Sequence, residues 1–101
     1  MSAYVLTDDA EADLRSIIRY TRKTWGVDQV RRYVAALELS MARIANGEGG
    51  FSDMSSLYPG LRMARCGHHY VFCLPRKGAP AWVVAILHER MDLLARVIDR
   101  L

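Results

Sequence analysis

Two cysteines and two histidines lie within the nine residues RCGHHYVFC, at positions 65–73. Such side chains ligate zinc or act as nucleophile and base, so the stretch is a candidate metal or catalytic site. A zinc site needs four converging ligands, usually from paired C-x₂-C or H-x₃-H motifs, and this stretch contains neither motif. In a strand, His68 and His69 would point to opposite faces. We therefore expect a strand with one face on the core, and no metal or cofactor.

Two catalytic alternatives remain open for this region. Cys66 follows Arg65, a cation that would lower the pKa of the thiol, but the spacing assigns no base to it. His88 ends an apolar run and, beside Arg62 and Arg65, could serve as general acid and base on a phosphodiester. The simpler interpretation of His88 is a ring that hydrogen-bonds the turn after the strand.

Length and composition indicate a single globular domain over residues 1–101, since half of the residues are apolar and a quarter are charged. The N-terminal residues lack the features of a secretory signal, and the longest apolar run, AWVVAIL, is too short to span a bilayer. We therefore expect a cytoplasmic protein with no membrane partner and with reduced Cys66 and Cys73.

The charge is unevenly distributed along the chain. Residues 1–60 carry seven Lys or Arg and eight Asp or Glu, a net of −1, whereas residues 61–101 carry seven and three, a net of +4. A basic C-terminal part favours an acidic partner, either nucleic acid or an acidic protein segment. The alternative is a basic surface that is simply solvated.

The first half of the sequence predicts a strand followed by two helices. Residues 3–6 are β-prone, and Thr7 or Asp8 can cap a helix that ends at Gly26. Asp28 can cap a second helix that ends at Asn46. Both segments place apolar residues at helical spacing, and the short connection predicts an antiparallel hairpin.

The second half predicts three strands and a last helix. Residues 48–60 read as a loop, and residues 61–65, 68–74 and 81–88 read as an antiparallel meander. The third of these strands is nearly all apolar, which predicts a central strand covered on both faces. A helix over 89–101 completes an α+β fold in the order β-α-α-β-β-β-α, with the helical hairpin packed on a mostly antiparallel sheet.

The expected last helix has more apolar surface than one sheet can cover. Seven of the eleven residues from Met91 onward are apolar and span an arc of roughly 200°. The excess indicates a partner surface surrounded by Arg90, Arg96 and Arg100. The alternative is a helix held between the sheet and a loop.

Several segments together resemble the ParE toxins of the RelE/ParE superfamily, and most closely those of plasmids. They are AYVLT and AEADL within 3–14, Y-T-x-x-x-W-G at 20–26, QVRRY at 29–33, LRMAR at 61–65, HHYVFCLP at 68–75 and VVAILHERMD at 83–92. The resemblance implies a RelE/ParE-like fold and a non-enzymatic toxin that stalls DNA gyrase on cleaved DNA, with the A subunit as the expected contact. It also implies a tightly bound ParD-like antitoxin, operator DNA bound only through that antitoxin, and stabilisation of a plasmid or cassette.

The resemblance and the apolar excess yield two sets of expected binding residues. For the target we expect Arg90, Met91, Leu94, Arg96, Ile98 and Arg100. For the antitoxin we expect Ile17, Tyr20, Trp25, Arg62, Arg65 and Tyr70, because a basic strand beside apolar side chains suits an acidic amphipathic tail.

The alternative function is a ribosome-dependent RelE-type endoribonuclease using Arg62, Arg65 and His88. Against it, no Tyr follows Tyr70, and the loop GEGGFSDMSSLYPG contains no Lys or Arg to stabilise charge on a phosphate. A third possibility is a non-toxic member that has kept only its binding role.

Overall fold

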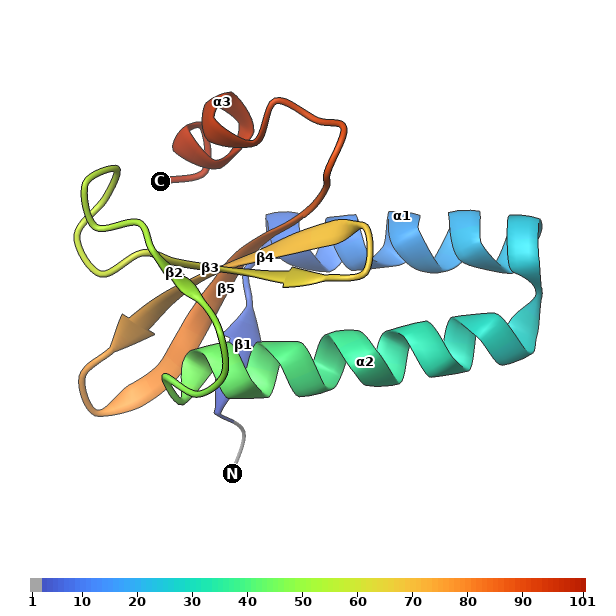
Figure 1. Cartoon of the computed structure of the whole chain (residues 1–101), viewed down its shortest axis with the longest axis horizontal. Helices are drawn as coiled ribbons and strands as arrows, with labels where there is room; N and C mark the ends of the chain where they lie inside the picture. The colour runs from blue at the N-terminus through green and yellow to red at the C-terminus, as the bar shows by residue number, and fades with distance from the viewer. Residues whose placement is uncertain (1–2) are drawn as a thin grey trace.

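The fold is an α+β arrangement in which a mixed sheet separates a long helical hairpin from a short C-terminal helix (Figure 1). The computed structural model describes residues 3–101. Its elements are β1 (Tyr4–Leu6), α1 (Asp8–Trp25), α2 (Val27–Ala45), β2 (Ser52–Asp53), β3 (Arg62–Cys66), β4 (His69–Arg76), β5 (Ala79–His88) and α3 (Leu93–Ile98). The expected element order is confirmed, with β2 as an additional two-residue strand inside the expected loop.

The helical hairpin turns on a single residue. The side chain of Thr7 caps α1 by accepting a hydrogen bond from the Ala10 N–H at 3.1 Å. Gly26 has φ +92° and is at once the C-terminal cap of α1 and the N-terminal cap of α2. Asp28 was expected to cap α2 but lies in its first turn, because the connection leaves no extra residue before the helix.

The sheet has the strand order β1-β5-β4-β3-β2. β3, β4 and β5 form the expected antiparallel meander, and β1 pairs with β5 in parallel. β4 is therefore the middle strand, and β5 lies one place from the edge rather than at the centre. A register shift occurs where Phe72 pairs with Ala85 but Cys73 pairs with Val83, so that Val84 forms a bulge.

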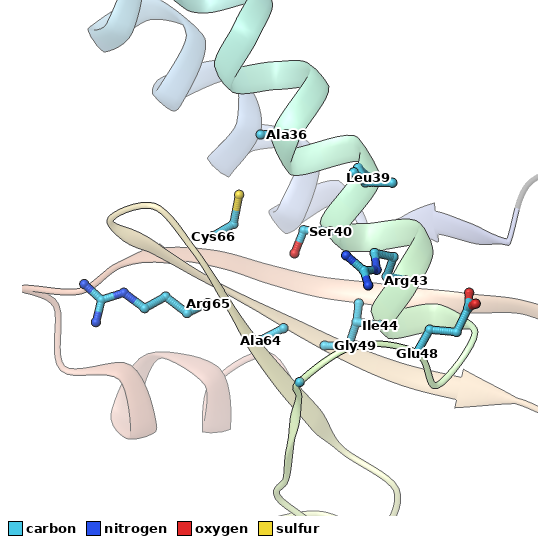
Figure 2. A pocket seen from close by; sticks show the side chains of 11 residues that line it. Ala36, Leu39, Ser40, Arg43, Ile44, Glu48, Gly49, Ala64, Arg65 and Cys66 are labelled. Atoms are coloured by element: carbon cyan, nitrogen blue, oxygen red, sulfur yellow. The ribbon is translucent and has the colours of Figure 1, made fainter.

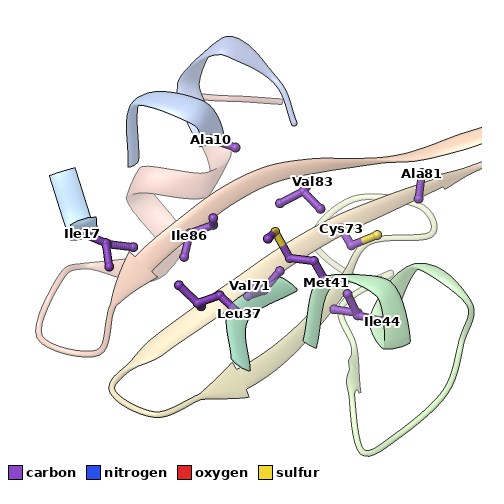
Figure 3. Packing of buried hydrophobic residues seen from close by; sticks show 10 residues of the cluster. All are labelled: Ala10, Ile17, Leu37, Met41, Ile44, Val71, Cys73, Ala81, Val83 and Ile86. Carbon is purple, nitrogen blue, oxygen red and sulfur yellow. The ribbon is translucent and has the colours of Figure 1, made fainter. Parts of the chain in front are cut away.

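Each face of the sheet carries its own core. Val71, Cys73 and Ile86 face the hairpin and pack against Leu37 and Met41 (Figure 3). Phe72, Leu87 and Val97 are fully or almost fully buried on the opposite face, where α3 and the loop before β3 cover the sheet. The predicted alternation of β4 and the burial of β5 on both faces are confirmed.

The C-terminal helix is shorter than the expected 89–101. Asp92 caps α3, and the residues before it hydrogen-bond elsewhere: Glu89 N–H donates to the His68 carbonyl in the β3–β4 turn, and Met91 N–H donates to the His88 carbonyl at the end of β5. Leu93 and Val97 turn toward the sheet. None of the helices in residues 3–101 is long and apolar enough to cross a membrane.

An ion pair closes the part of β5 that β1 does not reach. β1 pairs only with Ala81–Val83, so the next stretch of β5 turns backbone groups toward α1. Asp13 accepts the Ile86 N–H at 2.9 Å, and Arg100 donates to the Val84 carbonyl at 3.2 Å. The two side chains form a two-point ion pair, with Nη2 and Oδ1 at 2.8 Å, and are largely buried. Arg100, expected to face the target, is thus engaged inside the molecule.

Arg100→Met tests this contact, because it leaves the Asp13 carboxylate without its cation beside the strand edge. We expect the free energy of unfolding to fall by about 3 kcal/mol, as for other broken buried pairs. Denaturant titration measures it, with Arg15→Met as the control: the exposed Arg15–Glu11 pair contributes less than about 1 kcal/mol. Equal effects of the two substitutions would contradict the assigned role.

Candidate binding surfaces

The histidines of the opening motif gather with His88 at the end of the sheet beside the β3–β4 turn. The rings of His68 and His69 both lie close to His88, with centroids 6.2 Å and 5.2 Å from it. His68 hydrogen-bonds Glu89 at 3.2 Å, which holds the pKa of that carboxyl below its usual value. No group of three or more His, Cys, Asp or Glu within residues 3–101 is arranged to hold a metal ion.

His69 is held against α2 by Tyr33. The Tyr33 hydroxyl lies 3.0 Å from the Cys66 carbonyl, which can only accept, and it also contacts Nδ1 of His69. The single phenolic proton therefore goes to the carbonyl, and Nδ1–H of His69 donates to the phenol oxygen. Gly67 has φ +58°, and a Cβ there would lie 2.8 Å from the Tyr33 ring, so only glycine fits this turn.

The three candidate nuclease residues each have another partner. Nδ1 of His88 accepts the Arg90 N–H at 3.1 Å, which is the turn contact that the simpler interpretation predicted. Arg62 donates to the Ile44 carbonyl at 3.0 Å and stacks on Phe51, at the C-terminus of α2. Arg65 pairs with Glu89 at 2.9 Å. The two arginines are therefore directed to different parts of the molecule and do not converge with His88 on one point.

Neither thiol has the character of an activated nucleophile. Burial raises the pKa of Cys66, so the lowering expected from the adjacent Arg65 is wrong. Cys73 is fully buried in the hairpin-side core, and burial raises its pKa to about 11. Both cysteines are free. At neutral pH these thiols stay protonated, which is the state of structural rather than reactive cysteines.

A groove of about 240 Å³ runs between α2 and the open side of β3, and we call it the α2–β3 groove. Leu39, Ser40 and Arg43 line it from α2, and Ala64 and Cys66 line it from β3. In Figure 2, Ser40 and Cys66 point into the gap, and Leu39 lies toward the outer side of the helix. β2 pairs only with Arg62 and Met63, so no other strand within residues 3–101 lies beside the rest of β3 on this side. The groove therefore combines apolar side chains, a cation and an unpaired strand edge, as sites for extended peptides do.

A second surface lies on α3, on the other face of the sheet. Leu94 and Ile98 are each 51% exposed and lie one turn apart, and Met91 and Leu101 are exposed at either end. We call these four residues the α3 stripe. Arg90 and Arg96 are also exposed beside it. An apolar stripe of this kind on a small domain is typical of a protein interface.

The expected antitoxin residues are dispersed rather than gathered. Ile17 is part of the core, and Tyr20 and Trp25 are exposed far along the hairpin. Arg65 and Tyr70 lie together, with the guanidinium 5.7 Å from the ring centroid. Their side chains lie on the α3 side of the sheet, because Tyr70 packs with that core.

Leu39 and Arg43 are the binding candidates that the sequence analysis missed. Leu39 is 60% exposed, although it lies in a helix whose buried face is Leu37, Met41 and Ile44. An apolar residue two positions away from that face was the available signal. The groove itself depends on the packing of β3 against α2, which no local pattern reveals.

Comparison with known proteins agrees with this architecture. The family model for the ParE toxin of the parDE type II toxin–antitoxin system matches residues 4–93. The Toxin ParE of Escherichia coli is 71% identical over 101 residues, covering 100% of this chain and 98% of that toxin. Toxin ParE1 of Caulobacter vibrioides is 32% identical, covering 96% of this chain and 99% of its own length. Toxin ParE1 of Mycobacterium tuberculosis is 33% identical, with 91% and 94% covered.

The chain is therefore a toxin of a type II toxin–antitoxin system. Within that class it belongs to the ParE family, as the resemblance of its segments indicated.

Acidification tests the packing of His69. Burial, followed by the proximity of His88 and His68, lowers the pKa of His69 from 6.5 to about 4. The unfolded chain therefore binds a proton that the folded protein excludes between about pH 6.5 and pH 4, and stability falls as the pH drops through this window. Because the ring is only half-buried, we expect a loss of about 1–2 kcal/mol.

Thermal melts from pH 7 to pH 4 measure this loss. His69→Gln should flatten the pH dependence across the window, whereas His68→Gln, at a side chain that is 77% exposed, should reduce it only slightly because burial is the main cause of the shift. A His69→Gln variant that keeps the full acid sensitivity would show that another group is responsible.

Proposed function

We propose that this chain inhibits DNA gyrase, as toxins of the ParE type generally do, and that it acts in the cytoplasm by binding rather than by catalysis. The observation that carries the proposal is the α3 stripe, a half-exposed apolar surface on a protein of this family. A protein interface typically has an apolar centre that loses its water on binding and a polar rim around it. Here the α3 stripe would form the centre, and Arg90 and Arg96 would form the rim. The A subunit of gyrase is the proposed contact, and the complex stalls on cleaved DNA.

The endoribonuclease alternative receives no support from a specific contact. His88, Arg62 and Arg65 are each engaged in the fold, whereas cleavage of RNA needs cations placed around one phosphate. Primer extension on messenger RNA after induction discriminates between the two functions. Codon-linked cuts that disappear in a folded His88→Ala variant would replace the gyrase proposal.

We further propose that the ParD-like antitoxin seats part of its chain in the α2–β3 groove. An extended segment there can hydrogen-bond the open side of β3 and place an apolar side chain against Leu39. Arg43 at the groove suits a carboxylate of an acidic segment, whereas the Arg65 side chain lies with Tyr70 on the other face of the sheet. Tyr20, Trp25 and Tyr70 remain candidate contacts for a longer segment that continues over the surface.

Substitutions in the α3 stripe test the target surface. Leu94→Asp and Ile98→Asp place a charge in the proposed interface, and we expect the toxin concentration that half-inhibits gyrase supercoiling to rise by at least about tenfold. Because both side chains are half-exposed, the melting temperature should change little. Tyr58→Asp, at a 40% exposed position in the loop before β3, is the matched control and should inhibit like the native chain. Full inhibition by folded stripe variants would remove α3 from the interface.

A charge in the groove tests the antitoxin surface separately. Leu39→Asp should weaken antitoxin binding by about tenfold or more in calorimetry, because it sets a carboxylate against an acidic apolar segment. Tyr58→Asp again controls for added charge. The proposal for the groove would be wrong if Leu39→Asp and Tyr58→Asp bound the antitoxin equally well.

A further inference from the structure

The linked end of the helical hairpin is strongly basic. Residues 14–33, which we call the distal hairpin, contain six Lys or Arg and one Asp or Glu, a net of +5 in a chain whose total is +3. The cations are Arg15, Arg19, Arg22, Lys23, Arg31 and Arg32, opposed only by Asp28. The charge balance of the two halves of the sequence concealed this cluster, because the acidic first turn of α1 offsets it.

These cations are not needed to hold the fold together. Within residues 3–101 the ion pairs are made by other side chains, apart from the exposed Arg15–Glu11 pair. The remaining five side chains are exposed and form no hydrogen bond in this part of the chain. Five free cations clustered at one end of a small domain repel one another, so they favour an anionic partner.

The shape of the distal hairpin limits what that partner can be. The hairpin extends past the β3–β4 turn and away from the sheet (Figure 1). The hollow on its α1 side is lined by Arg15, Arg19, Arg22, Lys23 and a single apolar residue, Ile18. Four of the five side chains that line this hollow are cations, a higher density of charge than in the α2–β3 groove, so the hollow favours a densely charged anion over an acidic amphipathic peptide. A polyanion that presents only phosphates needs cations alone.

Two exposed aromatic rings accompany the cations. Trp25, at the end of α1, is 70% exposed, and Tyr20 is 67% exposed. Arg15, Arg19, Arg22 and Lys23 lie within nine residues of helix, and the first and last are about 12 Å apart along the axis, a length over which duplex DNA presents several phosphates. Cationic residues mixed with exposed aromatic rings are a common feature of nucleic-acid surfaces. Gly26, the one-residue link, holds the two cationic helices side by side.

We propose that the distal hairpin binds the phosphate backbone of duplex DNA without sequence preference, with Trp25 contacting the sugar–phosphate backbone. The inference rests on the proposed function, because a toxin seated on gyrase lies next to the DNA that the enzyme holds. The toxin then contacts both components of the stalled complex, gyrase through the α3 stripe and DNA through the distal hairpin.

Fluorescence anisotropy with a labelled 20-bp duplex tests the inference in the absence of gyrase. The double variant R22Q/K23Q should bind about tenfold or more weakly at 0.1 M salt, and the slope of log K against log salt should fall by about two. R76Q/K77Q, at the β4–β5 turn, removes the same charges elsewhere and should keep both the affinity and the slope. Trp25→Ala should lower the affinity without changing the slope.

Three results would overturn the inference. The first is that the native chain does not bind the duplex at 50 mM salt, and the second is that the two double variants lose equal amounts of duplex affinity. The third is that polyglutamate of equal charge displaces the labelled duplex as readily as unlabelled duplex does. A gyrase supercoiling assay separates this failure from that of the proposed function. A chain that inhibits gyrase but does not bind duplex refutes only the DNA contact, and one that binds duplex but leaves gyrase active refutes the proposed function.

Discussion

The contact on which the rest of the structure depends is the ion pair between Asp13 and Arg100 along the open edge of β5. Beyond Val83, no strand in the described part of the chain pairs with β5 on the β1 side, and the register is interrupted by the bulge at Val84. Unpaired N–H and C=O groups at a half-buried edge are costly. Asp13 accepts one N–H group of β5, Arg100 donates to one carbonyl of β5, and the two side chains neutralise one another. The pair therefore connects α1, β5 and the C-terminal residues.

The Asp13–Arg100 ion pair connects the helical hairpin on one side of the sheet with the C-terminal residues on the other side. The hairpin packs on one face of the sheet through Ile17, Leu37 and Met41, and α3 packs on the other through only Leu93 and Val97. A six-residue helix that buries only two side chains against the sheet contributes little stability by itself. Its neighbour Arg100 reaches around the strand edge to α1, and this fixes the orientation in which Leu94 and Ile98 face solvent.

Local chemistry made most of the fold predictable from sequence. The helical spacing of apolar residues, Gly26 and the apolar run of β5 each depend on neighbours in the chain, and they placed the hairpin and the meander. Features that depend on residues far away in the sequence could not be predicted in this way. Arg100 appeared free because Asp13 lies 87 positions away, and β2 is two polar residues that become a strand only by pairing with β3. The α2–β3 groove and the exposure of Leu39 follow from tertiary packing in the same way.

The placement of the groove and the stripe on opposite faces sets a minimum length for any inhibitor that must cover both. An extended chain advances at most about 3.3–3.6 Å per residue. A segment bound beside β3 therefore needs further residues to pass around the sheet before it contacts α3. A shorter segment would fill the groove and leave α3 accessible. The length of the bound segment, as well as its affinity, therefore decides whether such a partner blocks both surfaces.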